Sequence, residues 1–171
     1  AHLSDTRYHV QLLAAPMSPA TAPLVTAEGV RAAVEMLRHS HPLVVLDLAP
    51  SFSEVNLGVL ESADVVLVVS TPEVAGVRAA AATLEVLETL GFPQKDTLLI
   101  MNQVSSARPL ADGDIRGALD RAITATIPHD ARAFVESLNR GAPLVIAAPR
   151  SAAARVIADL AAQLAKRAVA L

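Results

Sequence analysis

The chain has 171 residues and a net charge of −3, and hydrophobic residues make up 53% of it. This length suits one domain with a sizeable core, the absence of cysteine excludes disulfides and cysteine-bound metals, and the negative charge argues against a broad nucleic-acid surface. No apolar run reaches the ~20 residues that a membrane-spanning helix needs, so we expect residues 1–171 to form a single α/β domain without a transmembrane segment.

The first part of the chain is predicted to form a strand and a helix. Residues 8–14, YHVQLLA, have the composition of a strand, and residues 16–23 have that of a loop. Thr26 is a candidate N-cap, because a hydroxyl at that place can accept a hydrogen bond from the first helical turn. The apolar residues that follow at helical spacing predict a helix that ends near residues 39–42, where Pro42 restricts the residue before it.

Residues 41–51, HPLVVLDLAPS, form a short apolar run that ends at Asp47 and a turn containing Pro50. A run without polar alternation is typical of a parallel strand that helices cover on both faces. An aspartate at the end of such a strand lies at the carboxyl edge of the sheet, where open α/β folds bind ligands. Asp47 is therefore a candidate for holding a magnesium ion or its water. No G-x-x-x-x-G-K-[ST] loop accompanies it, because neither Lys95 nor Lys166 follows a glycine.

Helices and strands alternate after this segment. The predicted strands are residues 64–70, 97–104, 123–127 and 143–147. The predicted helices cover residues 53–61, 71–90 with a cap at Thr71, 114–121, 130–139 with a cap at Asp130, and a last helix that opens at Pro149 or Ser151. A polar loop is expected at residues 105–112. This alternation predicts an α/β fold with a mostly parallel sheet and helices on both faces.

Four segments in this order resemble the MinD/ParA family of P-loop ATPases, and within it the CpaE/TadZ-like branch. They are LVVLDLAPSFSE at residues 43–54, ADVVLVVSTPEVAGVRAAAATLEVLETLG at 63–91, TLLIMNQV at 97–104 and IPHDARAFVESLNRGAPLV at 127–145. The resemblance implies a P-loop NTPase-like fold that is incomplete at its N-terminus, so that the chain is the C-terminal part of an ATPase domain. The missing phosphate-binding strand would lie inside the sheet, and its absence would expose strand edges.

The resemblance assigns roles to four residues. Asp47 would be the catalytic carboxylate and would hold magnesium through water, whereas Asn102 would face the adenine base and Pro128 and Asp130 would border it. Each position also has a structural alternative. Asp47 can cap the turn at residues 51–54, Asn102 can end its strand in an Asx-turn, and Asp130 can serve as a plain N-cap. Ala49 and Gln103 depart from the family pattern, which more often has proline and arginine there.

The resemblance further implies ATP and magnesium as cofactors of the complete domain, a homodimer, a cytoplasmic location and partners in a pilus or secretion apparatus. The chain alone lacks the phosphate-binding loop, so we expect it neither to bind ATP tightly nor to hydrolyse it. The alternative is a non-enzymatic protein-binding module on a degenerate ATPase fold. Glycine-rich sequence with a lysine, read upstream of residue 1, would distinguish the first hypothesis from the second.

Overall fold

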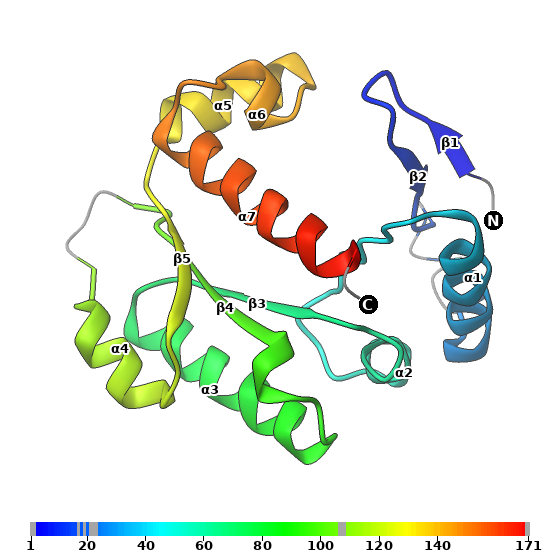
Figure 1. The fold of residues 1–171 in the computed structure, drawn as a ribbon, viewed down its shortest axis with the longest axis horizontal. Coiled ribbons are helices and arrows are strands. Elements are labelled where there is room, and N and C mark those ends of the chain that lie inside the picture. Colours follow the sequence, from blue (N-terminus) through cyan, green and yellow to red (C-terminus); the bar gives the residue numbers. More distant parts are fainter. Residues whose placement is uncertain (1–2, 17, 19, 21–23, 106–108, 170–171) are drawn as a thin grey trace. The chain divides into compact units, whose positions relative to one another are not determined.

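A computed structural model describes residues 3–16, 18, 20, 24–105 and 109–169 (Figure 1). Much of the loop predicted at residues 16–23, and the centre of that predicted at 105–112, lie outside these residues. The chain divides into two compact units, Ala1–Ser62 and Ala63–Leu171. Their union in one domain stays a prediction. Among the described residues, no helix is both long and apolar enough to cross a membrane.

The first unit contains a hairpin and two helices. Strands β1 (Leu3–Asp5) and β2 (Gln11–Leu13) pair antiparallel, so the strand predicted at residues 8–14 is shorter than expected. Helix α1 (Ala27–Ser40) begins as predicted, because the Thr26 hydroxyl accepts a hydrogen bond from the Gly29 amide at 3.1 Å. Helix α2 (Glu54–Leu60) packs against α1 and confirms the predicted short helix.

The strand predicted to end at Asp47 is absent from the structure. Residues 41–53 form neither helix nor strand, and Asp47 is exposed. Leu43 is 55% exposed and Val45 is 79% exposed, so the segment is not buried either. The physical reason is that a strand needs a neighbour to satisfy its backbone donors and acceptors, and no described residue pairs with this segment. The prediction that Asp47 ends a buried strand was therefore wrong.

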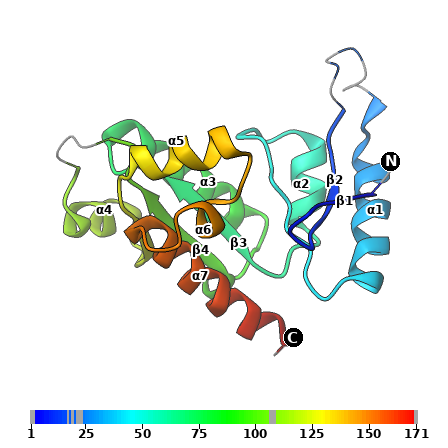
Figure 2. The same cartoon turned by 90° about the horizontal axis from the view of Figure 1, so that it is seen from above.

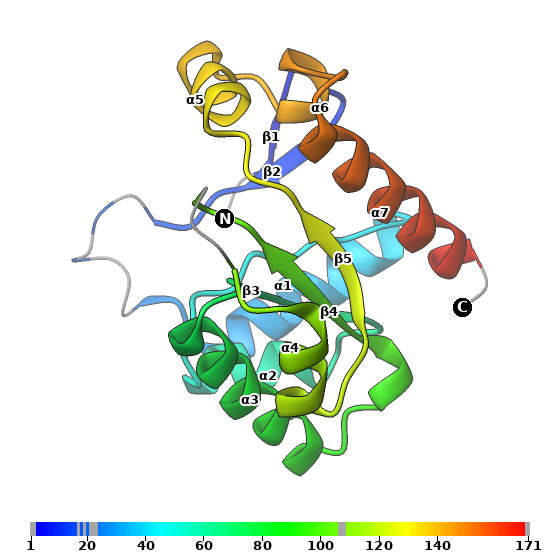
Figure 3. The same cartoon turned by 90° about the vertical axis from the view of Figure 1, so that its left-hand side faces the viewer.

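The second unit is built on a parallel sheet with the order β3-β4-β5. The strands are β3 (Val66–Ser70), β4 (Thr97–Asn102) and β5 (Ile123–Ile127). The helices are α3 (Val74–Thr89), α4 (Asp112–Leu119), α5 (Ala131–Arg140), α6 (Leu144–Ala147) and α7 (Ala152–Val169). Figure 3 shows α3 and α4 on one face of this sheet and α7 on the other. The predicted α/β class, with helices on both faces of a parallel sheet, is confirmed.

The core of this unit centres on β4. Leu99, Ile100 and Met101 are at most 1% exposed, because β4 has a neighbouring strand on each side and helices on both faces. Strand β3 lies at the edge of the sheet and is buried on alternate residues only. Val68 is 6% exposed, whereas Val69 is 60% exposed. As an edge strand, β3 therefore receives less cover than β4.

Two further predictions in this unit need correction. Residues 143–147 form helix α6 instead of a strand, with the amides of Ile146 and Ala147 both donating to the Pro143 carbonyl at 2.9 Å. A short apolar run is compatible with either structure, and here the helical hydrogen bonds decide. Helix α3 begins at Val74, with Glu73 as its N-cap, so the cap predicted at Thr71 was wrong.

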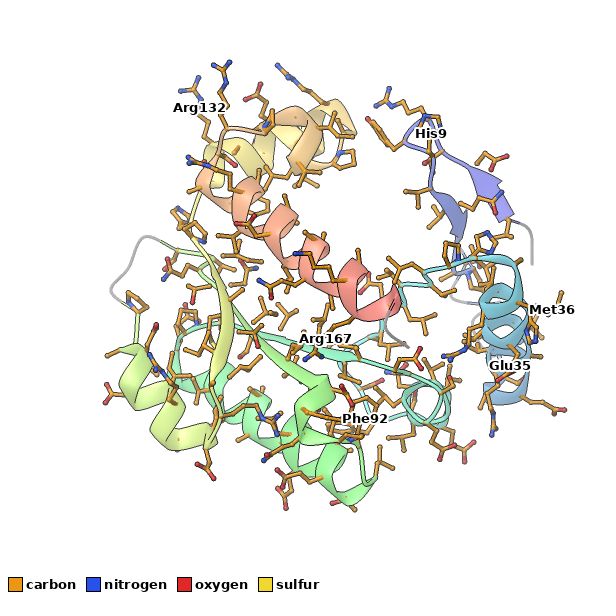
Figure 4. All side chains as sticks on the ribbon, viewed as in Figure 1. His9, Glu35, Met36, Phe92, Arg132 and Arg167 are labelled. Atoms are coloured by element: carbon orange, nitrogen blue, oxygen red, sulfur yellow. The ribbon has the colours of Figure 1, made fainter. Side chains whose placement is uncertain are left out.

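The C-terminal helix is tied to the turn that precedes β4. Arg167 of α7, labelled in Figure 4, donates to the Lys95 carbonyl at 3.2 Å and lies 3.7 Å from the Asp96 carboxylate. The turn is the 3-10 helix Gln94–Asp96. Figure 2 shows from above that α7 runs along the sheet. These contacts hold the end of α7 against the turn at which β4 begins. The candidate site lies at the other, carboxyl edge of the sheet.

Candidate functional site

The candidate site of the second unit lies at the carboxyl edge of its sheet. Because the strands are parallel, their last residues meet at one edge (Figure 3). Asn102 pairs with Ile127, and the next amide, that of Gln103, donates to the Ile127 carbonyl at 2.9 Å. This ladder places Asn102 beside the residue that precedes Pro128. The structure therefore brings together Asn102 and the loop that contains Pro128 and Asp130.

The side-chain amide of Asn102 has no hydrogen bond to any described residue, although the residue is half-buried. The alternative in which Asn102 closes an Asx-turn is thus not formed within the described part of the chain. An asparagine amide offers donors and an acceptor in one plane. That combination matches the donor and acceptor of adenine at N6 and N7. The geometry leaves Asn102 available to a planar polar ligand.

Asp130 caps helix α5. Its carboxylate accepts a hydrogen bond from the Ala133 amide at 3.1 Å, and the helix ends at Gly141, which has a left-handed φ of 56°. The structural alternative for Asp130 is therefore present. Its contact with a base stays a prediction. The cap also fixes where α5 starts, and so limits the path of the Pro128 loop before it.

We expect Asp130→Ala to lower the free energy of unfolding by about 1 kcal/mol, because the variant leaves an amide of the first turn without its acceptor. Asp130→Asn keeps a side-chain oxygen at the cap and should lose much less. Urea unfolding of the two variants, followed by circular dichroism, measures the difference. Equal losses would show that the hydrogen bond to Ala133 contributes nothing.

Asp47 belongs to the first unit and is followed by a closed turn. The Ser51 amide donates to the Ala49 carbonyl at 2.7 Å, across Pro50. The side-chain amide of Asn56 donates to the same Ala49 carbonyl at 2.8 Å and to the Ser51 carbonyl at 2.7 Å. Asn56 was not among the candidate residues predicted from the sequence. Its only signal was an asparagine inside a short helix, where this residue type is unfavourable.

The Asp47 carboxylate itself has no hydrogen bond to a described residue. The alternative in which Asp47 caps the turn at residues 51–54 is therefore not observed. Ser53 takes that place, and its hydroxyl accepts from the Asn56 amide at 3.3 Å. The role of Asp47 toward magnesium stays a prediction.

These residues fit one end of a nucleotide better than the other. Asn102 and the Pro128 loop offer polar and apolar contacts of the kind a base needs. The phosphate end would require a glycine-rich loop with a lysine, and the 171 residues contain no such sequence. Among the described residues there is no group of three or more His, Asp or Glu side chains that could hold a metal.

The family model of the cellulose biosynthesis protein BcsQ matches residues 17–164. The chain belongs to this family. A curated relative, a putative septum site-determining protein MinD from Emiliania huxleyi, is 27% identical over 127 residues, which are 71% of this chain and 46% of that protein. These matches confirm the MinD/ParA type of ATPase family that the sequence predicted.

Solved structures show the same fold. A ParA family ATPase from Chlorobium tepidum TLS is 24% identical with a TM-score of 0.87, over 95% of this chain and 66% of that one. MinD from Pyrococcus horikoshii OT3, solved with Mg-ADP, is 18% identical with a TM-score of 0.74, over 87% of this chain and 60% of that one. The chain thus spans less than two thirds of the relatives that it matches.

Proposed function

We propose that these residues are part of a MinD/ParA-like ATPase, in which they supply the base-binding edge and the magnesium-side carboxylate. A phosphate-binding loop would come from the rest of the protein. The observation that carries the proposal is the unbonded amide of Asn102, held at the carboxyl edge of a parallel sheet beside Ile127. The relative solved with Mg-ADP shares this fold and supports a nucleotide as the ligand.

Each residue has a separate task in the complete domain. Asn102 would bind the base through its side-chain amide, and Pro128 would pack against the base. Asp130 keeps the start of α5 in place, so that the Pro128 loop stays in one conformation. Asp47 would orient a water of the metal. Magnesium, when bound, supplies positive charge that stabilises the developing charge on the phosphates.

The biological role that we infer is positioning of a cell-envelope machine through ATP-dependent dimerisation. The segments quoted from the sequence favour the CpaE/TadZ-like branch, and with it a cytoplasmic protein that acts on a pilus or secretion apparatus. The family description favours a cellulose-producing machine as the second candidate. Both candidates share the nucleotide site, so the site is tested before the partner.

The test uses the full-length protein and a non-hydrolysable ATP analogue with magnesium, and titration calorimetry measures the dissociation constant. Asn102→Ala should weaken binding about tenfold, the equivalent of one or two hydrogen bonds. Asn139→Ala is the matched control, since Asn139 is exposed on α5 and should leave binding unchanged. If the dissociation constant is unchanged in Asn102→Ala, the proposed base site is wrong. No binding by the wild type would favour the non-enzymatic protein-binding module.

A further inference from the structure

Asn56 is a buried polar residue of the first unit, with 8% of its surface exposed. Asparagine is a poor residue inside a helix, because its side chain competes for backbone hydrogen bonds. Here that side chain leaves its own helix α2 and turns to the preceding loop. We propose that Asn56 is a positioning residue that fixes the backbone behind Asp47, an inference that rests on the proposed function.

The contacts of Asn56 close the turn from both ends. Its Nδ2 donates to the Ala49 carbonyl at 2.8 Å and to the Ser51 carbonyl at 2.7 Å, and it lies 3.2 Å from the Ser51 hydroxyl. The Ala49 carbonyl also accepts from the Ser51 amide. Two donor groups thus make three hydrogen bonds to the backbone carbonyls of Ala49 and Ser51, and Pro50 between them restricts its own φ.

Asp47 stands two residues before this turn and has no hydrogen bond to a described residue of its own. No strand restrains its backbone either, because residues 41–53 lack a ladder partner in the described structure. The turn is therefore the nearest fixed point of the backbone after Asp47. The cap that Ser53 places on α2 joins the turn to the helix, so Asn56 links Asp47 to a regular element.

Losing Asn56 should affect the carboxylate more than the fold. In Asn56→Ala the Ala49 and Ser51 carbonyls lose the side-chain donor, and only the hydrogen bond from the Ser51 amide to the Ala49 carbonyl still closes the turn. Changes to groups that orient a metal-side ligand usually cost about 10-fold to 100-fold in activity or metal affinity. We expect a loss of about tenfold in kcat. The KM for ATP should change little, because the proposed base contact is made by Asn102 and not by the turn at residues 49–51.

The experiment compares wild type, Asn56→Ala, Asp47→Ala and the double variant in the full-length protein. If Asn56 acts through Asp47, its substitution lowers kcat in the wild type and lowers it no further in the Asp47→Ala background. A purely structural role would produce the same loss in both backgrounds, and that result would overturn the inference. So would an unchanged kcat in Asn56→Ala. Asn139→Ala serves as the control for loss of an asparagine.

A second readout does not depend on activity. Hydrogen exchange of the Ser51 amide should become about tenfold faster in Asn56→Ala, because the turn opens more often. If that variant does not fold, Asn56→Gln replaces it, since the longer side chain displaces the same donor without emptying the site. Unchanged exchange at Ser51 would overturn the positioning role. A wild type that exchanges slowly at Ser51 but hydrolyses no ATP would refute the proposed function instead.

Discussion

Leu99→Ala should lower the free energy of unfolding by about 3 kcal/mol, because a buried leucine loses its transfer free energy and leaves a cavity. Leu99 lies on the central strand β4 and is 0% exposed. It pairs with Val68 of β3 on one side and with Ile123 of β5 on the other. The surrounding strands cannot collapse into the space without losing their own ladders, so little of the loss is recovered.

Leu138→Ala is the matched control for this prediction. Leu138 lies on α5 and is 78% exposed, so the same chemical change should alter stability by no more than about 0.5 kcal/mol. Urea unfolding of both variants of the 171-residue chain gives the comparison directly. Similar losses in the two variants would mean that β4 is not the centre of the core.

Gly76→Ala should also destabilise the fold, by about 2 kcal/mol, the usual range for overpacking. A Cβ at Gly76 would stand 2.4 Å from the Thr71 carbonyl oxygen and 2.4 Å from the Thr71 hydroxyl. The carbonyl is backbone, and Thr71 directly follows the last residue of β3, so it has little freedom to move. Helix propensity alone would favour alanine by about 1 kcal/mol. The close approach therefore reverses the usual sign.

Gly117→Ala tests the opposite case. Gly117 lies in α4, and a Cβ there would meet nothing within 4 Å. Alanine should therefore raise the free energy of unfolding by about 0.5 to 1 kcal/mol. Thermal and urea unfolding should show the two glycine variants moving in opposite directions. Stabilisation by both substitutions would contradict the tight contact between Thr71 and α3.

The sequence allowed good prediction of features that depend on neighbours in the chain. The caps at Thr26 and Asp130 were assigned correctly, because each rests on a side chain and an amide three residues later. Strand β5 was predicted with its observed bounds, since Pro128 ends it and its composition is typical of a strand. At these positions, interactions between residues close in the sequence were sufficient to predict the structure.

Features that depend on distant partners were predicted less well. The apolar run before Asp47 has the composition of a buried strand, but composition does not supply the backbone that a strand pairs with. The contribution of Asn56 was also hidden, because its hydrogen bonds reach back five and seven residues to a turn whose shape the sequence did not fix. For Asn102 the prediction from sequence was partly successful. Its place at the strand end was predicted, and its unbonded amide came from the structure.

The most direct test of the nucleotide site is a crystal structure of the full-length protein with Mg-ADP. We expect the adenine to lie within hydrogen-bonding distance of the Asn102 side chain and against Pro128. A nucleotide bound elsewhere, or an Asn102 amide bonded to protein in its presence, would contradict the assignment of this sheet edge as the base-binding site.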